Sequence, residues 1–286
     1  MSNYLVSDTD LTSVANAIRT KGGTSAQLEF PTDFVSAIGA IPSGGGGISV
    51  DDIATNTEPS GDIVLSNSVT SVASRAFQEK THITSISGNG VTIIRQYAFG
   101  NCTGLTEVSF PNCIYLSNTS AIQDGYLFAG CTNLQGFNLK KVQYAYGYYV
   151  FGHLGSSSKK AIIALPDLVM LDSNGAFRQS YFSAVDLGEG LANISNNAFY
   201  QGTCDNLILR RKNSVVSAGN KDALARLTTA LGNTIYIPKV LYDHLGDGTA
   251  YDYQAATNWS SATRTYAQIE GSYYETHYAD GTLIPT

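Results

Sequence analysis

Charged residues are scarce in this chain. Asp, Glu, Lys and Arg make up 14% of its 286 residues, whereas ordinary soluble domains carry roughly 25%. The net charge is −6 and no basic block occurs, which disfavours a nucleic-acid partner because such binding depends on clustered Lys and Arg. No apolar run approaches the roughly 20 residues of a membrane-spanning helix. We therefore expect neither nucleic-acid binding nor insertion into a membrane.

Cysteine and histidine are too few and too scattered for a metal or catalytic centre. The four cysteines include no Cys-x-x-Cys pair and have no histidine at ligand spacing, so small buried thiols are expected. The four histidines belong to no nucleophile motif, and Gly-x-Ser-x-Gly is absent. Residues 1–8 contain neither a basic nor an apolar stretch, so no signal peptide of the Sec type is expected. These absences predict a protein without catalysis, metal or cofactor.

The chain does contain an internal repeat. An Ala-Phe motif, or a close variant, recurs six times at intervals of 22, 29, 23, 26 and 22 residues. Its phenylalanines are Phe77, Phe99, Phe128, Phe151, Phe177 and Phe199. Most of them follow an apolar residue by five or six positions: Val72, Ile94, Ile122, Leu171 and Ile194. One such unit cannot bury its own apolar side, so we expect stacked units that bury Phe on Phe.

Each unit is expected to contain one strand and one return segment. Residues 107–110 alternate polar and apolar side chains, which is the period of a β-strand. Residues 94–99 predict a turn or short helical coil that leads to the next strand. Cys102 and Cys131 share the position three residues after Phe, where a small buried side chain fits.

This unit reads approximately I-x-x-x-A-F-x-x-C-x-x-L-x-x-V-x-(L/F)-P and resembles the BspA-like leucine-rich repeats. The resemblance covers about residues 63–210. It implies a mainly β fold with short helices, a leucine-rich repeat solenoid of about six units. The fourth unit departs from the pattern by an insertion, and the fifth and sixth lack the cysteine.

The segments on either side of the repeats differ from them. Residues 1–42 predict two short helices that dock to another protein, and residues 43–62 predict a Gly-rich linker and the entry to the repeats. Residues 63–212 are the expected solenoid. Residues 213–286 resemble the caps that close BspA-like arrays, ending in a β-hairpin with a two-residue turn at Asp280 and Gly281. Four parts are therefore expected along the chain.

The N-terminal phrase L-T-S-V-A-N-A-I-R-T-K-G-G-T-S-A-Q-L-E-F-P resembles leader segments of tail-associated and other virion proteins from phages of gut Firmicutes. The resemblance implies a bacteriophage virion protein, a tail fibre or tail-tip protein that binds the host surface. Its N-terminal helices would contact other virion proteins, and a homo-oligomer such as a trimer is compatible with it. It would be assembled in the bacterial cytoplasm and be extracellular after release. A bacterial BspA-like surface adhesin is the alternative, and a glycan-degrading enzyme on a β-solenoid is a third hypothesis.

Tyrosines gather at one position of the repeat. The residues two positions before each Phe are Arg75, Tyr97, Tyr126, Tyr149, Gly175 and Asn197. Tyrosine offers a large amphipathic contact area at low entropic cost, and its flat apolar ring suits the face of a sugar. Two interpretations stay open: a ladder that only stabilises the coil, or a surface that binds a host glycan or protein. The candidate binding residues are Tyr97, Tyr126, Tyr144, Tyr148 and Tyr149.

The outward positions of the strands become apolar toward the C-terminal end of the repeats. The residues concerned are Ile162, Ala164, Ala184 and Ile208. They predict a contact with the C-terminal hairpin or with another subunit.

Overall fold

The structure is a computed structural model that describes residues 60–117 and 125–285. These residues belong to one compact unit, Ser60–Thr286. The predicted helices of residues 1–42, most of the predicted linker and Ile122 lie outside the described residues.

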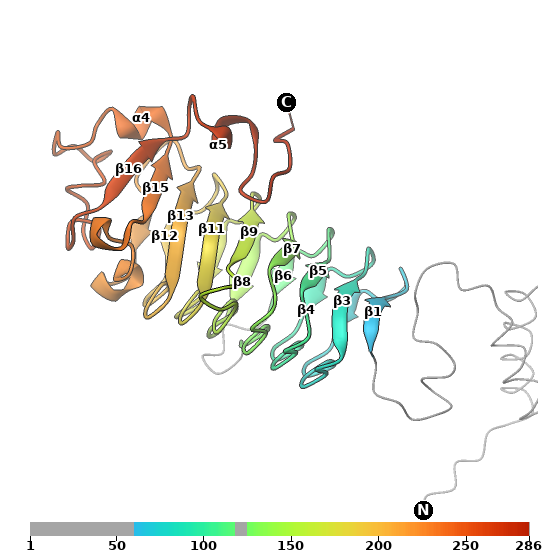
Figure 1. The fold of residues 1–286 in the computed structure, drawn as a ribbon. Coiled ribbons are helices and arrows are strands. Elements are labelled where there is room, and N and C mark those ends of the chain that lie inside the picture. The colour runs from blue at the N-terminus through green and yellow to red at the C-terminus, as the bar shows by residue number, and fades with distance from the viewer. Residues whose placement is uncertain (1–59, 118–124, 286) are drawn as a thin grey trace, which may run out of the picture. The chain divides into compact units, whose positions relative to one another are not determined.

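One strand from each repeat unit lies along the same side of a solenoid (Figure 1). The first four strands form a parallel sheet: β1 (Gly61–Val64), β3 (Ile83–Ser87), β5 (Glu107–Ser109) and β7 (Gly136–Asn138). The next sheet is also parallel and contains β9 (Ala161–Leu165), β11 (Tyr181–Leu187), β13 (Thr203–Leu209), β15 (Thr234–Ile237) and β16 (Thr265–Gln268). Ile162 N–H donates to the Gln135 carbonyl at 3.0 Å where the two sheets meet. The predicted leucine-rich repeat fold is therefore confirmed.

Shorter strands form a second side of the solenoid. Five of them pair in parallel: β2 (Ser71–Val72), β4 (Ile93–Ile94), β6 (Tyr115–Leu116), β8 (Tyr144–Tyr146) and β10 (Met170–Asp172). Two more pair with each other, β12 (Asn193–Ile194) and β14 (Ser217–Ala218). The turn expected over residues 94–99 therefore begins only after a short strand.

The register of these short strands corrects one expectation from the sequence. Leu116 pairs with Ile94 and with Ala145, and it is fully buried. Leu116 therefore occupies the apolar position of the third unit, to which the sequence had assigned Ile122. The interval from Phe99 to Phe128 is 29 residues long, and its extra residues lie between β6 and the turn that carries Phe128. Counting five or six residues back from Phe128 therefore ends inside this insertion.

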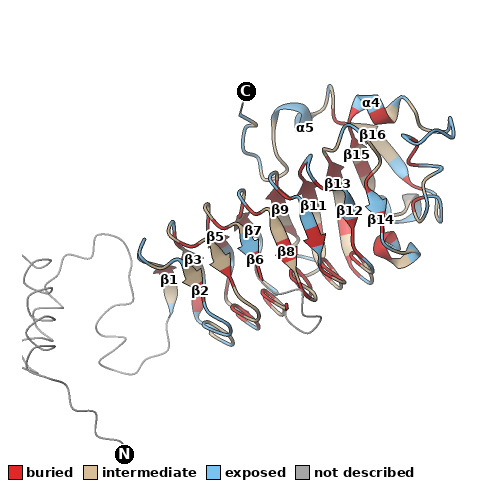
Figure 2. Ribbon diagram, turned by 180° about the vertical axis from the view of Figure 1, so that it is seen from behind, coloured by how far each residue is buried: buried red, intermediate tan, exposed pale blue. Residues whose placement is uncertain are grey.

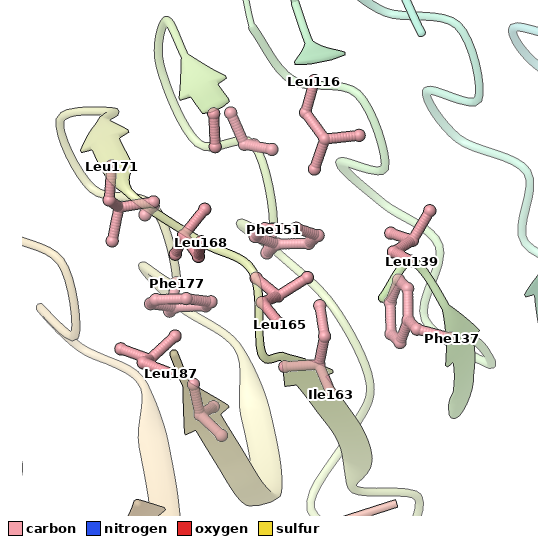
Figure 3. Close-up of a cluster of buried hydrophobic side chains, with 14 of the residues drawn as sticks. Leu116, Phe137, Leu139, Phe151, Ile163, Leu165, Leu168, Leu171, Phe177 and Leu187 are labelled. Carbon is pink, nitrogen blue, oxygen red and sulfur yellow. The ribbon is translucent and has the colours of Figure 1, made fainter. Parts of the chain in front are cut away.

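The phenylalanines form a continuous stack in the core. Consecutive ring centroids from Phe77 to Phe199 lie 5.6, 5.4, 6.0, 5.5 and 4.9 Å apart. Figure 3 shows two successive rings, Phe151 and Phe177, lying parallel among leucines. Five of the six rings are at most 1% exposed, but Phe77 is only half-buried because no described unit covers its outer face. The predicted ladder is confirmed apart from that first ring.

The position three residues after Phe joins successive units by hydrogen bonds. Cys102 Sγ donates to the Phe77 carbonyl at 2.8 Å, and Cys131 Sγ donates to the Phe99 carbonyl at 3.0 Å. In the fifth unit the Ser180 hydroxyl makes the same contact with the Phe151 carbonyl at 2.7 Å. All four cysteines are free and buried, as predicted. Serine replaces cysteine in the fifth unit because both are small donors.

The residues after Arg210 cover the last unit. They include two 3-10 helices, η1 (Lys221–Leu224) and η2 (Thr229–Leu231). Strand β15 and the short helix α4 (Lys239–Tyr242) follow them. The expected hairpin is reduced to a single antiparallel bridge between His277 and Leu283, because the residues before it form α5 (Tyr273–Thr276).

The C-terminal segment covers the apolar end of the sheet, as predicted. Ala184 and Ile208 are buried together with Ile269, and Tyr274 and Ala279 pack around them. Figure 2 shows the buried positions running along the successive strands to this end of the array.

Candidate binding surface

The residue two positions before each ladder Phe adopts a left-handed backbone. The φ angles are 56° at Tyr97, 52° at Tyr126 and 50° at Tyr149. This conformation costs an L-residue roughly 1–2 kcal/mol, and Gly and Asn adopt it most readily. Gly175 and Asn197 occupy it in the fifth and sixth units. Three consecutive tyrosines therefore stand where the backbone favours smaller residues, which makes this position a candidate for function.

Hydrogen bonds between neighbouring turns hold this backbone in place. Tyr97 N–H donates to the Gly125 carbonyl at 2.9 Å, and Tyr126 N–H donates to the Tyr148 carbonyl at 2.6 Å. Gly125 has to be glycine, because a Cβ there would lie 1.9 Å from the Tyr148 carbonyl oxygen. The turns stack as closely as the strands do, and the tyrosine side chains follow the same spacing.

Tyr97, Tyr126 and Tyr149 form a stack that we call the tyrosine ladder. The Tyr97 and Tyr126 rings are 5.2 Å apart and nearly parallel at 10°. The Tyr126 and Tyr149 rings are 4.9 Å apart and tilted by 54°. All three side chains are half-buried. Aromatic pairs of this kind contribute about 0.5–1.5 kcal/mol each beyond the area they bury.

An arginine covers each end of the ladder. Arg75 Cζ lies 4.8 Å from the Tyr97 ring centroid. Arg178 Cζ lies 5.3 Å from the Tyr149 ring and 4.9 Å from the Tyr200 ring, and its Nη1 donates to the Tyr149 hydroxyl at 2.8 Å. The ring faces are therefore occupied by other rings or by guanidinium groups. The expected stacking of sugar faces on these rings does not fit, and the ring edges and hydroxyls remain for recognition.

Two aromatic neighbours lie beside the ladder at Tyr149. The Tyr148 ring is 5.8 Å from the Tyr149 ring, and the His153 ring is also 5.8 Å from it. Burial, followed by the nearby Tyr149 and Tyr97, raises the pKa of Tyr126, so its hydroxyl stays protonated at neutral pH. Burial and the charge of Arg178 lower the pKa of His153, so this imidazole is neutral there. The surface is polar and carries its positive charge at the ladder ends.

Tyr144 belongs to a different cluster from the other four predicted residues. It lies on β8, where its ring stacks on Tyr115 at 5.1 Å and on Tyr146 at 6.2 Å. The chain turns at Gly147, whose φ is 90°, between Tyr144 and Tyr148. The structure therefore brings Tyr97, Tyr126, Tyr148 and Tyr149 together and places Tyr144 with two other tyrosines. We call Tyr115, Tyr144 and Tyr146 the sheet-face tyrosines.

The sequence analysis missed several of these residues. Arg178 and Tyr200 come directly after Phe177 and Phe199, so a column one residue after Phe would have indicated them. Tyr115 pairs with Tyr144, and aligning Leu116 with Ile94 would have placed it on the same outward face.

The described part of the chain offers no metal-binding cluster, and its Cys113 thiol is protonated. Residues 60–117 and 125–285 contain no cluster of three or more His, Cys, Asp or Glu that could hold a metal ion. Burial raises the pKa of the Cys113 thiol to about 12, so it stays protonated. Across the same residues, no helix has the length and apolar character needed to cross a membrane.

A cleft of about 360 Å³ lies between the array and the C-terminal segment, and its lining includes Arg210, Glu270 and Glu275. In this cleft the Arg210 Nε forms an ion pair with the Asp186 Oδ1 at 2.7 Å. Arg210 also donates to the carbonyls of Tyr274 and His277, so it holds the C-terminal segment.

Comparison with known proteins identifies the repeats. A family model described as a BspA type leucine rich repeat region matches residues 55–159 and 112–219, which together cover more than half of the chain. No curated protein matches the chain.

Several solved structures resemble the fold. A leucine-rich repeat protein of T. pallidum is 19% identical, with a TM-score of 0.44, over 64% of this chain and 80% of that one. A leucine-rich cell surface protein of Faecalibacterium prausnitzii is 20% identical, with a TM-score of 0.45, over 63% of this chain and 43% of that one. A leucine-rich repeat protein of Bacteroides ovatus is 19% identical, with a TM-score of 0.42, over 60% and 48%. The match spans less than half of the length of the last two proteins.

Proposed function

The chain belongs to the BspA-type leucine-rich repeat family, and we propose that it is a non-catalytic attachment protein that binds a cell surface through its tyrosine ladder. The observation that supports this most is the run of three tyrosines at left-handed positions. The stacking of the tyrosine rings only offsets the backbone strain at these positions, whereas a recognition surface gains contact area and hydroxyl groups.

We propose a bacterial cell-surface adhesin as the carrier of this activity. The family match extends over residues 55–219, which contain the whole ladder. In this proposal the repeat array presents the ladder, and the ligand is a glycan or protein on the surface of another cell.

A phage tail fibre or tail-tip protein is the second candidate. Its support is the resemblance of residues 1–42 to virion leader segments, and these residues lie outside the described part of the chain. The virion localisation, the docking to other virion proteins and the trimer belong to this candidate alone. Immunogold labelling separates the two, because an adhesin decorates bacterial cells whereas a tail protein decorates purified virions.

Adhesion of the full chain tests the attachment role. Beads coated with the protein should be retained by target cells or their isolated envelopes, and replacing Tyr97, Tyr126 and Tyr149 by Asn should abolish most of the retention. Asn suits the left-handed backbone, so the fold is kept. The matched control replaces the sheet-face tyrosines by Asn and should retain binding. Equal retention by both variants would show that the ladder is not the binding surface, and no retention of the wild type by any cell type would refute the attachment role.

A further inference from the structure

The tyrosine ladder presents a row of phenol rings at a regular short step. Its rings are 5.2 and 4.9 Å apart, and their faces are covered along the stack. A ligand that binds along the row must offer similar hydrogen-bonding groups at a similar short step. Contacts with single, isolated groups would not use the regularity of the row.

The two arginines at the ladder ends have no acidic partner among residues 60–117 and 125–285. No carboxylate of this part of the chain forms an ion pair with Arg75 or Arg178. The polar contact of Arg75 is the Gln78 side-chain oxygen at 3.5 Å. Arg178 donates from Nη1 to Tyr149, and its Nε is buried and so out of reach of a ligand. Arg75 is exposed and Arg178 is half-buried, so each guanidinium group keeps its charge and part of its donors for an external anion.

We propose that the tyrosine ladder, with Arg75 and Arg178 at its ends, binds an extended acidic polysaccharide whose chain runs along the solenoid axis. This inference rests on the proposed attachment function and names its ligand class. Tyrosine hydroxyls bind the sugar hydroxyl and ring oxygens, and the arginines bind carboxylates. Four steps of the repeat separate the arginines, a distance of roughly 19 Å at about 4.8 Å a step. The ligand must therefore be several sugars long.

The geometry favours a polysaccharide over the other extended polymers. Side chains on one face of a peptide strand recur at about 6.6 Å, twice the rise of a strand, and lose register with the ladder after two units. Single-stranded nucleic acids bind by stacking bases on free aromatic faces in a basic groove. The ring faces of the ladder are covered by other rings and by guanidinium groups, so bases cannot stack on them. A chain of sugars repeats its hydroxyl groups at every ring, which suits a row of phenols.

The arginines favour an acidic polysaccharide over a neutral one. Hydrogen bonds from a guanidinium group to a carboxylate are charge-assisted and stronger than bonds between neutral groups. Arg178 is already held between Tyr149 and Tyr200, so little side-chain freedom is lost when it binds an anion. Neutral sugars would leave both charges without a partner.

The test compares acidic polysaccharides with their uncharged counterparts. Binding of the full-length protein to polygalacturonate, alginate and hyaluronate is measured by biolayer interferometry, next to the same polymers with their carboxylates esterified. We expect at least one acidic polymer to bind at least tenfold more tightly than its ester. Binding should weaken as salt rises, because exposed charges are screened within about 8 Å at physiological ionic strength.

Variants assign this binding to the ladder. The double variant Arg75→Gln and Arg178→Gln should lose at least tenfold in affinity for the acidic polymer, with little change for the ester. Arg226→Gln removes an exposed arginine outside the ladder and should bind as the wild type does. Tyr126→Phe keeps the ring and removes the hydroxyl, so it should weaken binding several-fold. If the double variant does not fold, each single variant is measured instead.

The outcomes separate this inference from the proposed function. Equal affinity for an acid and its ester, or unchanged affinity in the arginine variants, overturns the acidic ligand. Failure of all three acids to bind, while the protein still adheres to cells, also overturns it and leaves the attachment role standing. Protease treatment of the target cells that abolishes adhesion would point to a protein ligand and would likewise overturn it. If the wild-type protein adheres to no cell type, the attachment role itself is refuted.

Discussion

Arg210 and Asp186 form an ion pair with two hydrogen bonds, Nε to Oδ1 and Nη2 to Oδ2, both 2.7 Å long. The Asp186 side chain is 1% exposed and that of Arg210 is 13% exposed. Arg210 also donates to the carbonyls of Tyr274 and His277, and Asp186 accepts from Ala279 N–H. The pair thereby attaches the C-terminal segment to the edge of the repeat sheet.

The first prediction concerns this attachment. Arg210→Met should destabilise the protein by about 3–5 kcal/mol, because it leaves a buried carboxylate without its partner. Residues 273–285 should become sensitive to protease while the repeats resist it, which limited proteolysis with mass spectrometry would detect. The double variant Asp186→Leu and Arg210→Met removes both charges and should be more stable than the single variant. Unchanged cleavage in the single variant would contradict the anchoring role.

The second prediction compares two rings of the phenylalanine ladder. Phe128→Ala should lower the free energy of unfolding by about 3–5 kcal/mol, the usual range for truncating a buried Phe. Phe77→Ala should cost clearly less, because Phe77 is half-buried and, among the described residues, its ring stacks on Phe99 alone. Chemical denaturation of both variants measures the difference. Equal losses would mean that Phe77 is covered as fully as Phe128.

The repeat spacing was sufficient to predict the core but not the ladder surface. The Phe residues and the outward strand positions recur at fixed places in each unit. Aligning the units was therefore enough to predict that Phe99 is buried and that the C-terminal segment covers Ile208. The position of Leu116 could not be predicted in this way, because an insertion shifts the count from Phe128.

The covering of the tyrosine faces was harder to predict from the sequence. The Arg178 contact with Tyr149 joins residues 29 positions apart, and it depends on the rotamers that these side chains adopt in neighbouring turns. Tyr144 was grouped with Tyr148 because they are close in sequence, but the left-handed turn at Gly147 separates them.

The third prediction concerns alkaline pH. Tyr253 is fully buried and its hydroxyl accepts from Val216 N–H at 3.0 Å. Burial raises the pKa of Tyr253 above its ordinary value. The unfolded chain releases this proton near pH 10, whereas the folded chain retains it. The contribution of Tyr253 to the free energy of unfolding is therefore complete below about pH 10 and decreases as the pH rises above it. The expected slope is about 1.4 kcal/mol per pH unit for each such tyrosine.

Unfolding of the wild type and of Tyr253→Phe between pH 8 and pH 11 tests this. The Phe variant should be less stable at neutral pH, because Val216 N–H loses its acceptor, but its stability should fall less steeply above about pH 10. Parallel curves would show that Tyr253 does not contribute to the alkaline loss. Tyr126→Phe provides the control, because that residue is half-buried and contributes less to the slope.

The last prediction separates the stability of the tyrosine ladder from its function. Tyr126 has a φ of 52°, which an alanine adopts at the same cost of roughly 1–2 kcal/mol but an asparagine adopts more readily. Replacing Tyr126 removes two aromatic contacts worth about 0.5–1.5 kcal/mol each. The free energy of unfolding of Tyr126→Asn should therefore lie within about 1 kcal/mol of the wild-type value, because the relief of backbone strain offsets the lost contacts. Tyr126→Ala loses the same contacts and keeps the strain. Denaturant unfolding of the two variants should show Asn as the more stable by about 1 kcal/mol, while both lose adhesion equally. An Asn variant several kcal/mol less stable than the wild type would instead make the ladder a structural element of the coil, which is the simpler of the two interpretations of these tyrosines.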